Sequence, residues 1–233
     1  MTLSRLSLPV ASALVLAGCA APPDHFHTLR PAVASAPASA RDTPRLLAVG
    51  PVTVPDALAR DEWVIRTGDT GAMVYDHQLW TQGLGADVAQ SLVDYLNRGG
   101  LPDGLWADAG PTGSGSGADL ERPAPLRVRV QVLRFDSMLA PSPAVADQVR
   151  WTIECLPSGS GLGPVDAGRY RTVRTAVRDA GGTAPAASAS IDASQRGFDQ
   201  IARAHSDTVR QVADDVAAAL RATAAERAQA CAR

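Results

Sequence analysis

The sequence of 233 residues contains no lysine, so all 22 of its basic residues are arginine. A phosphate-binding loop of the Walker type needs a lysine, and Schiff-base enzymes need an amine that condenses with a carbonyl. The absence of lysine therefore excludes both classes of site. Histidine is scarce as well, with four residues, and a net charge of −2 gives no electrostatic case for binding nucleic acid.

Cysteine is also rare, with three residues in the chain, Cys19, Cys155 and Cys231. Cys155 is in register with Val149, Trp151 and Ile153 on the apolar face of a predicted strand, which indicates a small buried hydrophobic residue. Cys231 lies three residues from the end of the chain, where ends commonly fray. A disulfide between Cys155 and Cys231 stays open, because an exported protein enters a compartment that permits disulfides.

Long hydrophobic runs are absent, and the apolar run at residues 6–16 is too short to span a membrane, which takes about 20 residues. It follows Arg5 and ends in Leu16-Ala17-Gly18-Cys19, so residues 1–18 are predicted to be a secretory signal peptide. Leu-Ala-Gly-Cys resembles the bacterial lipobox, which implies cleavage after Gly18 and acylation of Cys19. The alternative is an ordinary signal peptide that happens to end near a cysteine.

Acylation would make Cys19 the lipid attachment site, with palmitate among the expected chains. A single acyl chain binds a membrane only marginally, whereas two or three anchor a protein stably. Ala20 follows the cysteine, and by resemblance to lipoprotein sorting in Gram-negative bacteria the absence of aspartate there indicates the periplasmic face of the outer membrane.

Residues 19–44 are predicted to form the acylated N-terminus and a tether, in which about 12 loose residues, 32–43, set the distance to the folded domain. His25 to Leu29 is an exception, because it alternates like a short strand and is expected at a sheet edge. A metal site at His25 and His27 is the alternative, but no carboxylate or cysteine is spaced to complete it.

One domain is predicted over residues 45–225. Alternation of apolar and polar residues predicts strands, at residues 46–55, 62–66, 72–75, 105–107, 126–132, 149–155 and 169–177. Pro51 indicates an edge or a bulge, since it removes a ladder donor. The glycine-rich loops at 113–117 and 158–163 contain neither G-x-G-x-x-G nor G-x-S-x-G.

Two helices are predicted from apolar residues that recur every three or four positions, one from Trp80 to residue 98 and one from Ser194, as its N-cap, to residue 220. On the first, polar residues are expected to face water: Asp87, Gln90, Asp94 and Arg98. On the second, His205 is expected to be a core histidine.

The order of strands, helix, strands, helix predicts an α+β fold, with an antiparallel-rich mixed sheet and two helices packed on one face as a two-layer sandwich. Arg127, Arg129 and Arg150 would lie on the other face. Cross-strand pairing with Glu154 is expected there, and contact with lipid headgroups or a partner's carboxylates is the alternative.

Four features resemble the auxiliary lipoproteins of ABC-type transport systems, the PqiC-like family that accompanies intermembrane transporters of the mammalian-cell-entry (MCE) type. They are the lipobox, Phe26-x-Thr28-Leu29, the Val-x-Val-Pro-x-x-Leu-x-Arg run from Val52 to Arg60, and Trp80-x-x-x-Leu84 at the start of the helix. The chain departs from the family pattern around Arg60, at Ala57, Ala59, Asp61 and Glu62.

The resemblance implies a non-enzymatic adaptor without cofactor or metal, which docks a periplasmic MCE-domain component to the outer membrane and supports lipid transport and membrane integrity. It also implies partner-binding residues, namely Val54, Pro55, Leu58, Arg60 and Trp80. Three alternatives stay open: a structural or assembly-factor lipoprotein of the envelope, a lipid-binding module with an apolar cavity, and a hydrolase whose triad comes from distant residues. Homo-oligomerisation also stays open.

Overall fold

Alternating apolar and polar segments build one mixed sheet of eight strands in the computed structural model, which describes residues 22–30, 45–109, 126–156, 171–183 and 191–232. The strands are β1 (His25–His27), β2 (Arg45–Thr53), β3 (Glu62–Arg66), β4 (Ala72–Trp80), β5 (Leu105–Ala109), β6 (Leu126–Met138), β7 (Ala144–Cys155) and β8 (Arg171–Thr183). The helices are α1 (Leu84–Gly99), α2 (Ile191–Ala222) and α3 (Ala224–Ala232), with short 3-10 turns η1 (Asp56–Leu58) and η2 (Pro102–Gly104).

Strand β6 lies at the centre of the sheet. One edge of it pairs along its whole length with β7, and β7 pairs with β8, so these three strands form an antiparallel meander. The other edge is shared, because the first half of β6 pairs with β2 in parallel while Met138, its last residue, pairs with Arg66 of β3. On this shared edge β2 pairs in turn with β5, while β3 is followed by β4 and then by β1.

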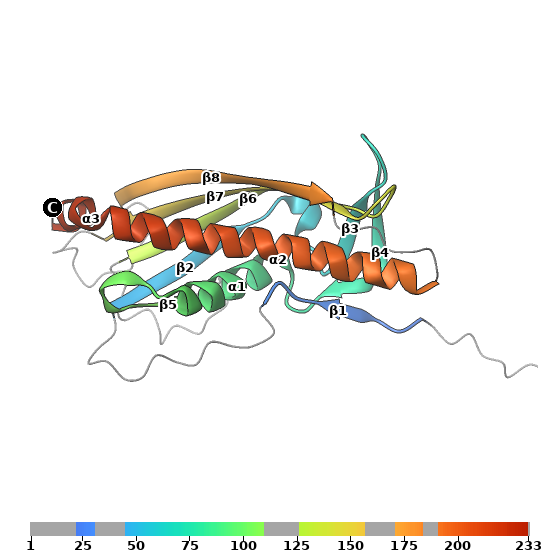
Figure 1. Ribbon diagram of the computed structural model, residues 1–233, viewed down its shortest axis with the longest axis horizontal. Helices are drawn as coiled ribbons and strands as arrows, with labels where there is room; N and C mark the ends of the chain where they lie inside the picture. The colour runs from blue at the N-terminus through green and yellow to red at the C-terminus, as the bar shows by residue number, and fades with distance from the viewer. Residues whose placement is uncertain (1–21, 31–44, 110–125, 157–170, 184–190, 233) are drawn as a thin grey trace, which may run out of the picture.

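The predicted fold class is confirmed, since the helices cover one face of a mixed sheet (Figure 1). Strand β3 has the predicted bounds. The register between β2 and β6 shifts between Val49 and Val52, so Pro51 marks a bulge. Strand β2 pairs on both edges, and Pro51 is therefore not on an edge strand.

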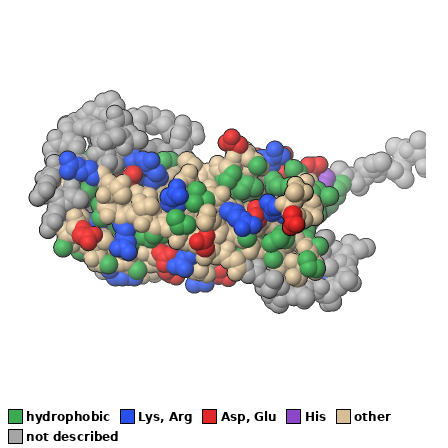
Figure 2. All heavy atoms as spheres, turned by 90° about the horizontal axis from the view of Figure 1, so that it is seen from above, with side chains coloured by type: hydrophobic (Ala, Val, Ile, Leu, Met, Phe, Trp, Pro, Cys, Tyr) green, Lys and Arg blue, Asp and Glu red, His purple; other side chains and the backbone are tan. Residues whose placement is uncertain are grey.

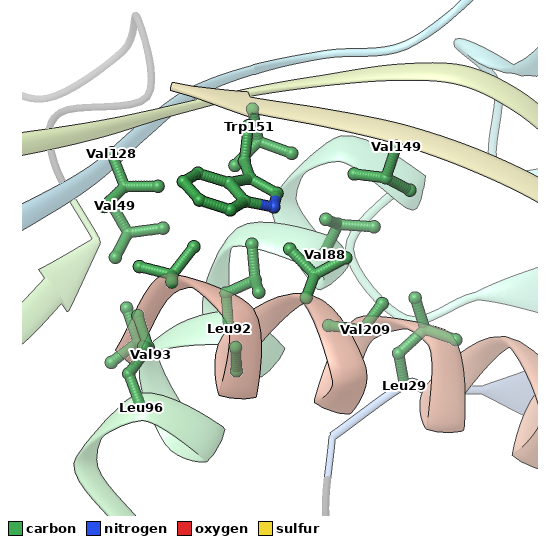
Figure 3. Close-up of a cluster of buried hydrophobic side chains, with 14 of the residues drawn as sticks. Leu29, Val49, Val88, Leu92, Val93, Leu96, Val128, Val149, Trp151 and Val209 are labelled. Atoms are coloured by element: carbon green, nitrogen blue, oxygen red, sulfur yellow. The ribbon is translucent and has the colours of Figure 1, made fainter. Parts of the chain in front are cut away.

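The hydrophobic core fills the layer between the sheet and the helices α1 and α2. Trp151 of β7 points into this layer, where apolar side chains of α1 and α2 meet those of the central strands (Figure 3). Burying one such valine or leucine completely contributes roughly 1.5 to 3 kcal/mol, so this layer dominates the stability of the fold. No helix in the described residues is long and apolar enough to cross a bilayer.

Three local predictions are wrong. Trp80 is the last residue of β4 and not the start of a helix, because Gly83, at a φ of 74°, separates it from Leu84. Ser194 lies inside α2, which begins three residues earlier at Ile191, and so it is not the N-cap. Asp87 and Asp94 do not face water, since both are buried.

The N-terminal segment belongs to the folded domain. Strand β1 lies at the sheet edge, as predicted, and pairs in parallel with β4, His25 opposite Gln78 and His27 opposite Trp80. Leu29 is completely buried in the same core. The folded part therefore includes residues before position 45, while the predicted loose stretch at 32–43 lies outside the described residues.

Candidate functional site

The predicted partner-binding loop connects β2 to β3 and lies beside the first turn of α1. Within it the Leu58 N–H donates to the carbonyl of Pro55 at 2.8 Å, which forms η1. At its end the Asp61 carbonyl accepts a hydrogen bond of 2.7 Å from the N–H of Trp80. The backbone of the loop is therefore held both within itself and to the strand that leads into α1.

The five predicted partner-binding residues divide into outward and inward side chains. Arg60 is exposed and Pro55 is half-buried. Val54 and Leu58 are partly buried and pack against the core, and Trp80 is only 5% exposed. The structure thus brings all five to one region, but it leaves Trp80 no surface of the size a partner would need.

The buried ring of Trp80 lies beside the loop, against Trp63 and at the cavity that Leu58 also lines. Its ring packs against that of Trp63, with centroids 4.4 Å apart. Together with Leu58 and Leu84 these rings line a cavity of about 10 Å³, space for one water molecule. The side chain of Leu58 therefore lies at the same small cavity as this buried pair of tryptophan rings.

A chain of hydrogen bonds runs through the interior beside this cavity. Trp63 Nε1 donates to Ser137 Oγ at 2.9 Å, since an indole nitrogen can only donate, and Ser137 Oγ forms a second hydrogen bond of 2.8 Å with His205 Nε2. His205 Nδ1 then donates to Asp147 Oδ2 at 3.0 Å; Oδ1 of the same carboxylate lies at 2.9 Å but without hydrogen-bond geometry. Thr208 Oγ1 also donates to Oδ2, at 2.7 Å.

This order of serine, histidine and aspartate is the order found in hydrolase triads. Here, however, Ser137, His205 and Asp147 are all buried, and His205 is stacked on Phe135 with centroids 3.7 Å apart. The cavity next to Ser137 has room for water and not for a substrate. The arrangement fits a structural role, because its buried hydrogen bonds join β6, β7 and α2. His205 is a core residue, as predicted.

A second buried carboxylate holds the N-terminal segment. Asp87, in the first turn of α1, accepts from Thr28 Oγ1 at 2.8 Å and from the Leu29 N–H at 2.7 Å. Burial raises the pKa of Asp87 above its usual 3.8, although both hydrogen bonds and nearby Arg30 oppose the change. The position at a helix N-terminus also favours the negative charge.

Two further contacts complete the N-terminal clamp, which is defined here by its residues: Thr28, Leu29, Arg30, Asp87, Asp94 and Ser206. Ser206 Oγ of α2 donates to the Leu29 carbonyl at 2.8 Å. Arg30 Nε donates to Asp94 Oδ2 at 2.9 Å. Both backbone polar groups of Leu29 are therefore satisfied in the interior, and the segment is fixed to both α1 and α2.

Sequence reasoning missed this clamp because Asp87 and Asp94 occupy the polar side of a helical pattern. A signal existed, since Thr28-Leu29 belongs to the family-like Phe26-x-Thr28-Leu29 motif. Only the structure shows that the motif's threonine and leucine are the residues that a carboxylate 58 positions later binds.

On the opposite face of the sheet the predicted pairing is confirmed. Arg127 Nε donates to Glu154 Oε2 at 2.8 Å, and Arg129 lies 3.4 Å from Oε1 of the same carboxylate. Arg150 donates to Gln131 Oε1 at 3.0 Å. These contacts pair the three arginines with side chains of the same face, and the single carboxylate of Glu154 offsets part of their positive charge.

Cys155 is completely buried, as predicted, and Cys231 of α3 packs against the same core. Burial and then a hydrogen bond to Cys231 raise the pKa of the Cys155 thiol to about 12. Both cysteines are free thiols in the structure, so the disulfide that the sequence left open is not formed in it. Cys19 lies outside the described residues.

Metal ligation finds no support in the part of the chain that the structure describes, where no three histidine, cysteine, aspartate or glutamate side chains gather to hold an ion. His27 Nε2 instead donates to Gln78 Oε1 at 2.6 Å, and its ring packs edge-on against Trp63.

Comparison with known families decides the affiliation. The model of the ABC-type transport auxiliary lipoprotein components matches residues 27–217. The chain belongs to this family. The N-terminal clamp, the loop from Val54 to Arg60 and the buried network around His205 of this auxiliary lipoprotein all lie inside the matched range.

Two solved structures share the fold of this auxiliary lipoprotein. An uncharacterized protein has 16% sequence identity and a TM-score of 0.54, and the match covers 85% of this chain and 99% of the other. A protein of the DUF330 family from Xanthomonas campestris has 15% identity and a TM-score of 0.55, covering 88% and 98%. None of the curated proteins matches the chain.

Proposed function

We propose that this auxiliary lipoprotein is an adaptor, anchored by Cys19 to the periplasmic face of the outer membrane, that docks an MCE-domain component of an intermembrane lipid transport system. The family match is the observation that carries the proposal, because it ties the chain to ABC-type transport. The lipobox supports the anchor, and the resemblance to PqiC-like proteins supports the MCE partner and a role in membrane integrity.

The loop around Arg60 is the proposed docking surface. Its backbone is held by η1 and by Trp80, and Leu58 rests on the Trp63–Trp80 pair. A fixed loop loses little conformational entropy when a partner binds. Arg60 presents an exposed guanidinium from this base, which suits a carboxylate of the partner. In this proposal Pro55 and Arg60 make contact, while Val54, Leu58 and Trp80 hold the loop in shape.

Affinity capture of the acylated protein from membranes tests the proposal. We expect it to recover an MCE-domain protein, and Arg60→Glu to lower the recovery about tenfold, which corresponds to about 1.4 kcal/mol of binding free energy. The matched control is Arg98→Glu, at another exposed arginine. Recovery of abundant porins alone contradicts the MCE partner, and equal loss from both variants contradicts the loop as the docking surface.

The alternatives find less support in the geometry. A lipid-binding module needs an apolar cavity between sheet and helices, but in the described residues core side chains fill that layer (Figure 3). A hydrolase needs an accessible nucleophile, and Ser137 is buried beside a cavity of about 10 Å³. Capture that recovers envelope assembly proteins and no transporter component would favour the structural alternative.

A further inference from the structure

The N-terminal clamp shortens the connection between lipid anchor and domain. Because β1 pairs with β4 and Leu29 is buried, residues 32–43 do not separate Cys19 from the fold. Only residues 20–24 lie between Cys19 and His25. Six peptide steps span at most about 20 Å when fully extended. If Cys19 is acylated, the start of β1 stands within that distance of the bilayer.

This start of β1 lies at one end of an elongated molecule. The β3–β4 hairpin and the beginning of α2 lie at the same end, while α3 and the first residues of β2 and β8 lie at the opposite end (Figure 1). The short connection therefore selects which end faces the membrane. The hairpin end is near the anchor, and the α3 end points away from it.

Exposed apolar side chains are present at the hairpin end. Phe26 on β1 is 63% exposed, and Met73 on β4 is 51% exposed with Val74 beside it. Figure 2 shows hydrophobic side chains at this end of the molecule, interspersed with acidic and basic ones. The carboxylate of Asp24 accepts a hydrogen bond of 2.8 Å from His77 Nδ1 of β4, which links the residue before β1 to this end of the sheet.

We infer that the hairpin end of the domain, with Phe26 and Met73, rests on the lipid surface of the membrane that holds Cys19. Apolar side chains at such a surface bury their area among headgroups and upper acyl chains. The inference rests on the proposed acylation of Cys19. Exposure alone would not select this end, because Leu46, at the start of β2 in the opposite end, is 37% exposed. The clamp and the five-residue connection select it.

Lipid quenching of a fluorescent label tests this orientation. The acylated full-length protein is labelled at Met73→Cys or, as the matched control, at Leu46→Cys. Both variants also carry Cys231→Ser, so that the buried Cys155 is the one native thiol left in the described residues. Each is reconstituted into vesicles of phosphatidylethanolamine and phosphatidylglycerol that contain brominated lipid. We expect quenching at position 73 to exceed that at position 46 about threefold or more, since only the former contacts lipid.

Two insertions test whether the clamp and the short connection set the orientation of the domain. A 12-residue glycine-serine insertion between Ala21 and Pro22 lengthens the connection and should remove the difference between the two labels. The same insertion after residue 38, beyond the clamp, should leave the difference unchanged. Circular dichroism of each variant checks that the domain is folded.

The outcomes distinguish the orientation from the anchor. Vesicle flotation reports the anchor, and a protein that does not float overturns both the acylation and the inference. Flotation with equal quenching at the two positions, or with stronger quenching at position 46, overturns the orientation alone. Loss of the difference with the insertion after residue 38 would show that the clamp does not set it, and this also overturns the inference.

Discussion

Two buried carboxylates hold this domain together, and they do so in different places with different partners. Asp147 lies between sheet and helix, where it binds side chains of α2, His205 and Thr208. Asp87 lies at the start of α1, where it binds a backbone N–H and a hydroxyl of the N-terminal segment. The first joins the two layers of the fold, whereas the second attaches the N-terminal segment to the start of α1. Their removal should therefore have different consequences.

The largest effect is expected at Asp147. Asp147→Ala leaves His205 Nδ1 and Thr208 Oγ1 buried without their shared acceptor, at a cost of about 1 to 3 kcal/mol for each group. Urea denaturation would show this loss across the whole domain. Asp108→Ala, at an exposed aspartate of β5, is the control and should change stability by less than about 0.5 kcal/mol. A loss at Asp147 no larger than at Asp108 would contradict the role of the network.

A smaller and local effect is expected at Asp87. Asp87→Ala leaves the Leu29 N–H unsatisfied in the interior, at a cost of about 1 to 3 kcal/mol. Hydrogen exchange should become faster in β1 and at Leu29, while β6 and β7 keep their protection. If exchange instead rises equally in β6, the two carboxylates support one cooperative unit, and the distinction drawn between them is wrong.

The smallest effect is a pH dependence specific to Asp87. Because burial raises its pKa above 3.8 in the folded state, the folded protein takes up a proton before the unfolded chain does as the pH falls. Stability contributed by this proton uptake is fully present below pH 3.8 and is lost as the pH rises through the folded-state pKa.

The wild-type protein should therefore gain stability relative to Asp87→Asn when the pH is lowered from neutral to about 4. Denaturation of both proteins over this range measures the difference. If the wild-type protein instead loses stability relative to Asp87→Asn on acidification, the hydrogen bonds from Thr28 and Leu29 outweigh the effect of burial on the pKa of Asp87.

Local periodicity was enough to predict most elements of the fold. Strand β3 has the predicted bounds, the meander of β6, β7 and β8 was predicted as long antiparallel strands, and both long helices followed from their apolar stripes. Alternation and the 3.6-residue period report directly which side of an element is buried. The helix was wrongly predicted to start at Trp80, because the spacing of four residues between Trp80 and Leu84 matches a helix. Gly83 lies between them and precedes the first residue of α1.

The polar clusters were beyond such reasoning. Ser137, Asp147 and His205 come from three elements, with His205 separated by 68 and 58 positions from its two partners. Asp87 looked like a solvated helix residue because the segment that covers it lies 58 positions earlier. Periodicity identifies a polar face, but whether water or another segment covers that face depends on tertiary packing.

Helix α2 runs beside the sheet from the hairpin end toward α3 (Figure 1). With 32 residues and a rise of about 1.5 Å per residue, it measures roughly 48 Å. In the proposed orientation α2 runs from the membrane side of the domain into the periplasm, and its length separates α3 from the bilayer.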